Sequence, residues 1–209
     1  MNEIKDKSVE TFLDELASKQ ATPGGGSAAA VMGAQAAALT SMVCNLTIGK
    51  PKYAEVAAEM QVLLAASEAL RATLVGMIKA DVDVFDKLMA CYGLPKSTDQ
   101  EKVYRTEQIQ TVLKEATIVP LECAKACAKA VKLSKTAAEK GNLGVISDAG
   151  VGAMAGYAGL KSAALNVYIN AASLKDRDFA EARLAELQEV MAGVDIAAED
   201  IYQIVKRKL

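Results

Sequence analysis

A single carboxylate occupies a position where an apolar side chain is expected. At about 100° per residue of helix, one narrow arc collects Leu74, Ile78, Phe85, Leu88 and Tyr92. Asp81 falls inside that arc, whereas Asp83 and Asp86 fall outside it. A carboxylate that faces a protein interior is costly unless it is hydrogen-bonded or paired. Asp81 is therefore either part of a structural polar network or a group that moves protons, and the pattern leaves both open.

A second helical stripe combines small residues with amides. Helical spacing places on one side Asp148, Gly152, Ala155, Gly159, Ser162, Asn166 and Asn170. Close packing of two helices explains such a stripe if the amides are hydrogen-bonded across the contact. The alternative is one wall of a ligand groove, in which small residues leave room and the amides supply hydrogen bonds.

A glycine-rich turn, Thr22-Pro23-Gly24-Gly25-Gly26-Ser27, enters a helix without charges. Backbone N–H groups at a helix N-terminus bind anions, and glycine lets a ligand approach the main chain. The spacing Gly24-x-Gly26-x-x-Ala29 formally satisfies a dinucleotide fingerprint, but no predicted strand precedes it. The three glycines therefore form either a plain turn or a place of close approach to a ligand.

The residue types that are missing narrow the chemistry. The chain has no histidine, which excludes Ser-His-Asp and Cys-His catalysis and zinc held by histidine. No C-x-x-C pair occurs among Cys44, Cys91, Cys123 and Cys127, and no secretory signal pattern is present. We expect a cytoplasmic protein with reduced thiols and no metal, in which carboxylate, Lys, Tyr, Cys or water transfers protons.

The composition predicts one helical domain. The 209 residues are 52% hydrophobic and 24% charged, with a net charge of -2, which is typical of a globular chain with one sizeable core. Aromatic residues make up 4% and tryptophan is absent, so strand-forming residue types are scarce. We expect residues 1–209 to form a single all-α domain. The charge balance, without a long basic run, argues against nucleic acid as a partner.

Prolines and glycines divide the chain into helical segments. Helices are expected over residues 8–19, 27–48, 51–91, 98–140, 147–172 and 178–206. Thr98 and Glu101 form a capping box that opens the fourth helix, and Pro120 should bend it. Without a long linker between the segments, an antiparallel up-and-down bundle of long helices is the expected arrangement.

Two of these helices carry almost no charge. Residues 27–48 have none, and their length alone would permit a membrane span. Polar residues interrupt the apolar run and alanine contributes little transfer energy, so a helix buried in a bundle is favoured over a membrane span. Residues 147–172 carry only Asp148 and Lys161. Two helices with so little polar face need many neighbours, which predicts a homodimer.

The ordered motifs resemble one family, the cyclodeaminase/cyclohydrolase folate enzymes related to the cyclodeaminase part of formimidoyltransferase-cyclodeaminase. The motifs that carry the resemblance are Thr22-Pro23-Gly24-Gly25-Gly26-Ser27, Gly49-Lys50, residues 81–85, Leu94-Pro95-Lys96, Val119-Pro120-Leu121, Gly141-Asn142-Leu143, Ser147-Asp148, Asn166-Val167 and Ile169-Asn170. The chain resembles the stand-alone cyclohydrolases of that family most, because the formimidoyltransferase portion is absent and residues 42–50 are similar to theirs.

The resemblance implies an all-helical dimer that binds folate in a groove, with Asp81 as the catalytic residue. We expect hydrolysis of 5,10-methenyltetrahydrofolate to 10-formyltetrahydrofolate, with the folate as substrate and no cofactor. Asp81 would act as general base and acid on a bridging carbon that is already electrophilic. The residues assigned to the substrate are Pro23, Gly24, Gly25, Gly26, Lys50, Asn142, Asp148, Asn166 and Asn170. Lys50 is assigned by hypothesis to the glutamate tail.

Two other functions stay open at this point. A formimidoyltetrahydrofolate cyclodeaminase, which releases ammonia, passes through the same cyclic species, and residue spacing does not separate the two reactions. A non-catalytic helical interaction module would use its inward Asp and Asn side chains only to specify register.

Overall fold

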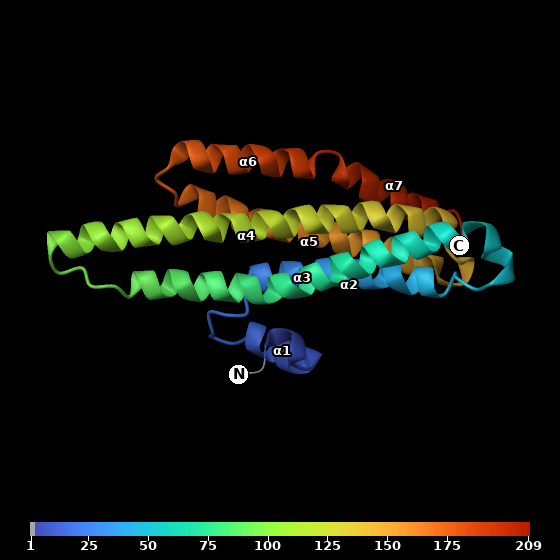
Figure 1. Cartoon of the computed structure of the whole chain (residues 1–209), viewed down its shortest axis with the longest axis horizontal. Coiled ribbons are helices and arrows are strands. Elements are labelled where there is room, and N and C mark those ends of the chain that lie inside the picture. The colour runs from blue at the N-terminus through green and yellow to red at the C-terminus, as the bar shows by residue number, and fades with distance from the viewer. Residues whose placement is uncertain (1–2) are drawn as a thin grey trace.

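The computed structural model describes residues 3–209, and within that range the chain is helical and contains no strand. Figure 1 shows the long helices side by side, with shorter ones along one flank. The long helices are α2 (Gly25–Asn45), α3 (Ala57–Tyr92), α4 (Asp99–Lys140) and α5 (Ile146–Ala172). The remaining elements are η1 (Ile4–Asp6), α1 (Val9–Leu16), η2 (Pro51–Val56), η3 (Leu143–Val145), α6 (Arg177–Met191) and α7 (Val194–Lys206). The all-α prediction is confirmed.

The charge-free helix α2 packs against three neighbours, α3, α4 and α5. It runs against α5 in the opposite direction. Near one end of their contact, a Cβ on Gly159 would lie 3.0 Å from the carbonyl oxygen of Ala29, and further along, a Cβ on Gly152 would lie 3.3 Å from that of Ala36. The small residues of the α5 stripe therefore serve close helix packing over this stretch.

Buried hydroxyl groups tie α2 to its neighbours. Thr40 shares a hydrogen bond of 3.1 Å with Ser134 of α4, and Ser41 shares one of 2.8 Å with Ser67 of α3. These pairs satisfy polar atoms in a core made largely of alanine, where an unpaired hydroxyl would be costly.

Pro120 lies inside α4, which continues through it to Lys140. Proline has no N–H, so the carbonyl of Ala116, four residues earlier, loses its helical donor. The Asn170 amide nitrogen on α5 donates to this carbonyl oxygen at 2.6 Å. A side chain from a neighbouring helix thus repairs the hydrogen bond that the proline removes.

The observed helix ends match the sequence prediction at the start of α4 and differ from it near the C-terminus. The capping box at Thr98 and Glu101 is present, as predicted. The single helix predicted over residues 178–206 is wrong, because α6 ends at Met191 and α7 begins at Val194. Gly193 between them has a φ of 72°, a left-handed conformation that interrupts a helix.

Three helical stretches, Gly25–Asn45, Pro51–Tyr92 and Leu143–Ala172, are long and apolar enough to cross a membrane by length and composition alone. The first is the most buried of them inside the fold, and Pro51–Tyr92 is the least. The preference for a bundle over a membrane span remains a prediction. α3 therefore has a long exposed face.

The glycines of the helix contacts predict opposite effects of alanine at two positions. Gly159→Ala should lower the free energy of unfolding by about 1–3 kcal/mol, because the new Cβ would meet the Ala29 carbonyl and the Gly33 backbone nitrogen at 3.0 and 3.1 Å. Gly76→Ala is the control: on α3 its Cβ would meet no atom of its own chain within 4 Å, so in the isolated chain helix propensity should add up to about 1 kcal/mol. Urea unfolding measures both, and equal effects at the two sites would contradict the packing described.

Candidate functional site

Asp81 on α3 lies directly against the first turn of α2. The Ser27 hydroxyl donates a hydrogen bond of 2.8 Å to Asp81 Oδ2. The other oxygen, Oδ1, lies so close to Gly26 that a Cβ there would be 2.0 Å from it. Ser27 is buried and the Asp81 side chain is half-buried. The inward orientation predicted for Asp81 is therefore confirmed, and glycine at position 26 is what lets the carboxylate approach.

The carboxylate takes the place of a missing cap on α2. The residue before the helix is Gly24, which has no side chain to bond the free N–H groups of the first turn. Asp81 supplies an acceptor from another helix, at the end of α2 where the helix dipole favours negative charge. The glycine turn is thus a place of close approach, and the group that approaches it is this chain's own carboxylate.

Opposing effects act on the protonation of Asp81. Burial is the larger effect and raises the pKa of Asp81, while the Ser27 hydroxyl and the Ser27 backbone N–H lower it. No Lys or Arg among residues 3–209 forms an ion pair with Asp81. On the same helix, Lys79 is paired with Asp83. The result is a desolvated carboxylate without a protein counter-ion.

Asn166 of α5 completes the cluster from the other side of the glycine turn. A Cβ on Gly25 would lie 3.7 Å from its amide nitrogen, which donates to the Ser162 carbonyl at 3.0 Å. Gly25 itself is exposed, and Pro23 before the turn is buried. The structure therefore brings together Asp81, the turn from Pro23 to Gly26 and Asn166, all of which the sequence assigned to the site.

Three assigned residues lie at the opposite end of the bundle. Lys50 and Asn142 lie near the C-terminal end of α2, whose 21 residues span about 30 Å. Asp148 is in the first turn of α5, 18 residues and about 27 Å of helix away from Asn166. The prediction that these residues share a site with Asp81 does not hold within one chain, because helical spacing fixes the face of a residue and not its distance from another helix.

Two of the assigned asparagines already serve the fold. The Asn142 amide nitrogen donates to the Leu46 carbonyl at 2.8 Å, and its side-chain oxygen accepts from the Gly144 N–H at 3.1 Å. Asn142 therefore ties the end of α2 to the turn before α5. The Asn170 amide nitrogen donates to the Ala116 carbonyl, which Pro120 leaves without a helical donor on α4.

Ser27 is the site residue that the sequence assignments missed. It belongs to the glycine-rich motif, but nothing in the local sequence shows that its hydroxyl meets the Asp81 carboxylate, 54 residues away in the chain. The sequence does give one indication of a role for Ser27. It lies in the first turn of a helix without charges, so a charged hydrogen-bond partner for its hydroxyl must come from another helix.

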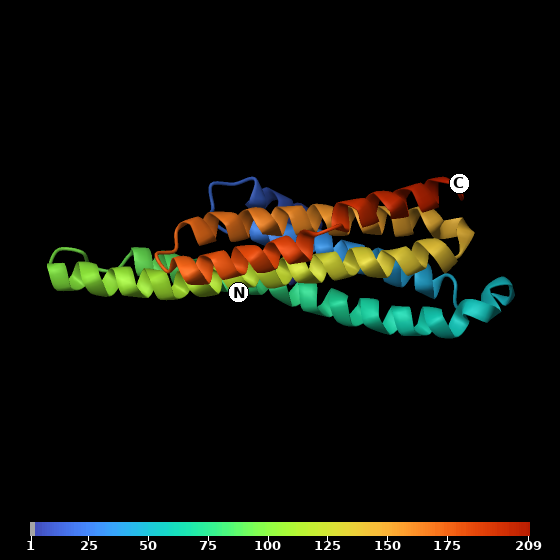
Figure 2. The same ribbon diagram turned by 90° about the horizontal axis from the view of Figure 1, so that it is seen from above.

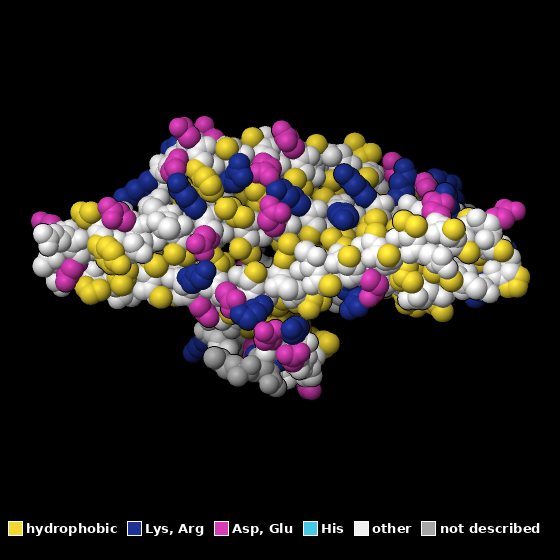
Figure 3. All heavy atoms as spheres, viewed as in Figure 1, with side chains coloured by type: hydrophobic (Ala, Val, Ile, Leu, Met, Phe, Trp, Pro, Cys, Tyr) yellow, Lys and Arg dark blue, Asp and Glu magenta, His cyan; other side chains and the backbone are white. Residues whose placement is uncertain are grey.

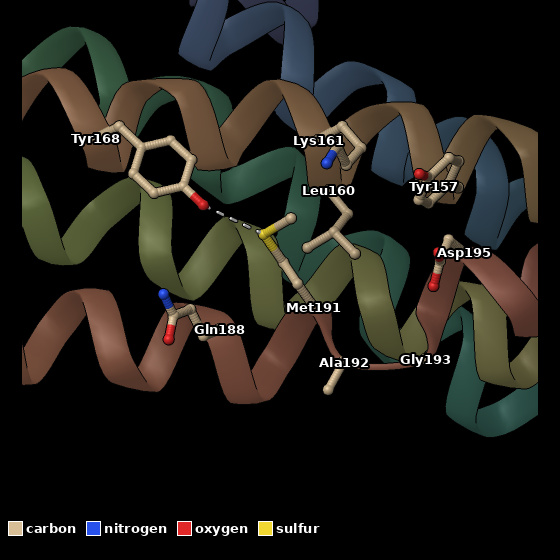
Figure 4. Close-up of a pocket in the computed structure, with 9 residues that line it drawn as sticks. All are labelled: Tyr157, Leu160, Lys161, Tyr168, Gln188, Met191, Ala192, Gly193 and Asp195. Atoms are coloured by element: carbon tan, nitrogen blue, oxygen red, sulfur yellow. Dashed lines mark hydrogen bonds between the residues drawn. The ribbon is translucent and has the colours of Figure 1, made fainter.

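One cavity lies beside this cluster and a second lies apart from it. One of about 400 Å³ is lined by Thr22 and Pro23 of the turn and by Val82, next to Asp81. Another of about 280 Å³ lies where α6 meets α7 and contains Lys161, Tyr168 and Asp195; in Figure 4 the Tyr168 hydroxyl points to Met191. Lys161 and Tyr168 lie on the face of α5 turned away from Asn166, so this second cavity is separate from Asp81.

Within residues 3–209, no group of three acidic or thiol side chains converges as metal ligands would.

Comparison with known proteins agrees with the resemblance. A family model described as formiminotransferase-cyclodeaminase matches residues 8–189. Methenyltetrahydrofolate cyclohydrolase of Methylorubrum extorquens is 57% identical over 204 residues, 98% of each chain. Formimidoyltransferase-cyclodeaminase of Rattus norvegicus is 35% identical over 85% of this chain, which spans 33% of the rat protein.

The fold agrees with a solved structure over nearly its whole length. The crystal structure of formiminotetrahydrofolate cyclodeaminase from Thermotoga maritima has a TM-score of 0.82 and 33% sequence identity, and the match covers 99% of this chain and 98% of that one. From the family match, the sequence identities and this fold, the chain belongs to the formiminotransferase-cyclodeaminase family.

Proposed function

We propose that this chain is a methenyltetrahydrofolate cyclohydrolase, which hydrolyses 5,10-methenyltetrahydrofolate to 10-formyltetrahydrofolate. The observation that carries the proposal is the 57% identity, over 98% of both chains, to a protein of that name. The Asp81 cluster supports it, because it offers a hydrogen-bonded carboxylate beside a glycine turn where a ring can approach the main chain.

The chemistry needs one group that accepts and returns a proton. The bridging carbon of the substrate belongs to an amidinium cation, so water can add to it once the water loses a proton to Asp81. The C–N5 bond of the adduct then breaks, N5 takes the proton from Asp81, and the hydroxyl proton leaves to solvent. A carboxylate does both steps without a cofactor.

The environment of Asp81 suits this role. The Ser27 hydroxyl fixes Oδ2, and no Lys or Arg of residues 3–209 neutralises the carboxylate. The substrate brings its own positive charge, which favours the ionised carboxylate despite burial. Ser27 is in this proposal a positioning residue, since it holds the carboxylate in one orientation and lowers its pKa.

Formimidoyltetrahydrofolate cyclodeaminase is the second candidate. The Thermotoga maritima structure bears that name and shares the fold at 33% identity, below the 57% of the cyclohydrolase. In that reaction N10 attacks the formimidoyl carbon and ammonia leaves, so the same carboxylate would serve a different leaving group.

We further propose that the helical bundle works as a homodimer in which each site uses both chains. The exposed face of α3 forms an uncharged stripe of small residues, which are Ala58, Val62, Ala65, Ala69, Ala72, Thr73 and Gly76. Val62 is 72% exposed on it. Figure 3 shows few charged side chains where this part of α3 faces the viewer, whereas charges gather over α6 and α7.

The position of the stripe determines what a second chain would bring. The stripe is centred near residue 67, so antiparallel packing of two copies about a twofold axis there would place Asp81 level with residue 53 of the other copy. The Tyr53 hydroxyl accepts from the Leu143 N–H at 3.0 Å, next to Asn142, and Lys50 lies just before. A homodimer of this kind brings the end of the partner that carries Lys50, Asn142 and Asp148 level with each Asp81 along the helix axis.

The cyclohydrolase proposal predicts a large loss of turnover for Asp81→Asn. Asparagine keeps the shape and accepts the Ser27 hydrogen bond but takes up no proton, so kcat should fall about 10²–10⁴-fold. Loss of methenyltetrahydrofolate absorbance gives the rate, with circular dichroism as the folding control. Turnover within a few-fold of wild type would remove Asp81 from the mechanism. Ammonia release from formimidoyltetrahydrofolate, without hydrolysis of the methenyl compound, would favour the cyclodeaminase.

The same variant predicts a pH-dependent gain in stability. Burial holds the pKa of Asp81 above its ordinary value, so wild type loses stability as pH rises through that raised pKa, and Asp81→Asn does not. The variant should melt higher than wild type at about pH 8, and the difference should vanish toward about pH 3. Thermal unfolding across this range checks the sign. A variant less stable than wild type at pH 8 would mean that the hydrogen bonds of the ionised carboxylate to Ser27 outweigh the cost of its burial.

The dimer proposal predicts complementation between two inactive variants. Asp81→Asn and Lys50→Ala chains each form homodimers with two defective sites, but a heterodimer has one intact site. Random mixing should restore roughly a quarter of wild-type activity. Co-expression with two affinity tags isolates the heterodimer, and each variant refolded alone is the control. A mixture no more active than its components, or a monomer at micromolar concentration in sedimentation, would contradict the proposal.

A further inference from the structure

A large cavity lies under the N-terminal segment, between it and the α2–α3 pair. Its volume is about 690 Å³, within the size range of ligand pockets. Apolar side chains from three helices make most of its wall, namely Val9, Phe12, Leu13, Val31, Ala34, Ala38, Val75 and Ile78. The views of Figures 1 and 2 show α1 set apart from the rest of the bundle, joined to it through the turn before α2.

The cavity begins next to the Asp81 cluster. Ile78 precedes Asp81 by one helical turn on α3, and Val31 follows Ser27 by one turn on α2. Ile4 and Lys7 line both this cavity and the smaller one at Thr22 and Pro23. The two spaces therefore flank one short segment of chain beside the proposed reaction site.

Cations outnumber acids around this apolar space. Lys5, Lys7 and Arg71 line it, against Asp6 alone. Each of the three has an acidic partner, as in the pair of Arg71 and Glu68, whose side chains are 44% and 42% exposed. Exposed ion pairs contribute little to stability, so a ligand carboxylate can replace Glu3 at Lys5 and Glu68 at Arg71 at low cost.

The distance from Asp81 to Arg71 fits one part of the folate. The two residues are ten positions apart on α3, about 15 Å along the helix axis. An aminobenzoyl group followed by an extended glutamyl residue is about as long as three to four extended residues, roughly 12 Å. With the one-carbon bridge at Asp81, the glutamate carboxylates reach the Arg71 side chain.

We propose that this cavity holds the aminobenzoyl-glutamate part of the folate substrate, with the ring against Val31, Val75 and Ile78 and the carboxylates at Arg71 and Lys5. The inference rests on the proposed cyclohydrolase function and adds where the substrate lies. A small ligand suits the cavity better than a second copy of the chain, because α1 and η1 already cover it and the Lys7–Glu15 ion pair of 2.7 Å holds them in place. The glutamate tail is then held on α3, and Lys50 of the partner subunit lies toward the Asp81 end of the substrate.

Charge reversal at the far end of the cavity tests the proposal. Arg71→Glu should raise KM for methenyltetrahydrofolate about tenfold with kcat little changed, because it removes a charge-assisted contact to the tail and leaves Asp81 untouched. Lys102→Glu is the matched control. It makes the same charge change in an exposed pair of the same i, i+3 spacing, with Asp99, on α4. Its KM should equal that of wild type.

Filling the cavity tests the same inference without charge. Ala38→Trp projects an indole from the exposed side of α2 into this space and should also raise KM. The fragment 4-aminobenzoyl-glutamate should compete with substrate in wild type and lose affinity in both variants. 4-Aminobenzoate, which lacks the glutamate, should bind weakly to all of them.

The outcomes separate the two proposals. A wild-type chain that does not hydrolyse methenyltetrahydrofolate rejects the cyclohydrolase function. An active wild type in which the fragment does not compete, and in which Arg71→Glu matches Lys102→Glu, rejects the tail site alone. Dissociation of a dimer by Ala38→Trp in sedimentation also rejects it, since the cavity would then be a contact between subunits.

Discussion

The site depends on a hydrogen bond of 2.8 Å from Ser27 to a half-buried carboxylate at the start of α2. Burial raises the pKa of Asp81, and the Ser27 hydroxyl and backbone N–H oppose that rise. The helix has no capping side chain of its own at Gly24, so the Ser27 N–H and the carboxylate satisfy each other. An acid is thus held away from water, in one orientation, without any cation of the described chain beside it.

The contact between Asp81 and the start of α2 requires the two helices to approach closely, and small residues on α2 permit this approach. Gly26 leaves room for Asp81 Oδ1, while Gly33 and Gly159 leave room for the Cys127 sulfur where α2, α4 and α5 meet. α2 also carries no charged side chain, and its buried hydroxyls bond to serines on α3 and α4. The close helix packing and the position of the Asp81 carboxylate therefore both depend on the small side chains along α2.

The sequence predicts those features that depend on one helix at a time. Periodicity places Asp81 on the inner face of α3, and the motif at Thr98 predicts a cap that is present. Features that join two helices are not readable in this way. Asn170 looks like a ligand contact until Pro120, 50 positions earlier, is seen to leave a carbonyl that needs its amide. Lys50, Asn142 and Asp148 fall on suitable motifs, yet about 27–30 Å of helix separates them from Asp81 in one chain.

Charge explains why such a site would bind its substrate and release its product. On the proposed mechanism the substrate is a cation, and it is the missing counter-ion of a desolvated carboxylate. Hydrolysis removes that cationic charge, so the one-carbon group of the product no longer attracts Asp81. A lysine or arginine paired with Asp81 would lower its pKa, but it would also cancel the attraction that distinguishes substrate from product. The absence of charge along α2 is thus a requirement of selectivity as well as of packing.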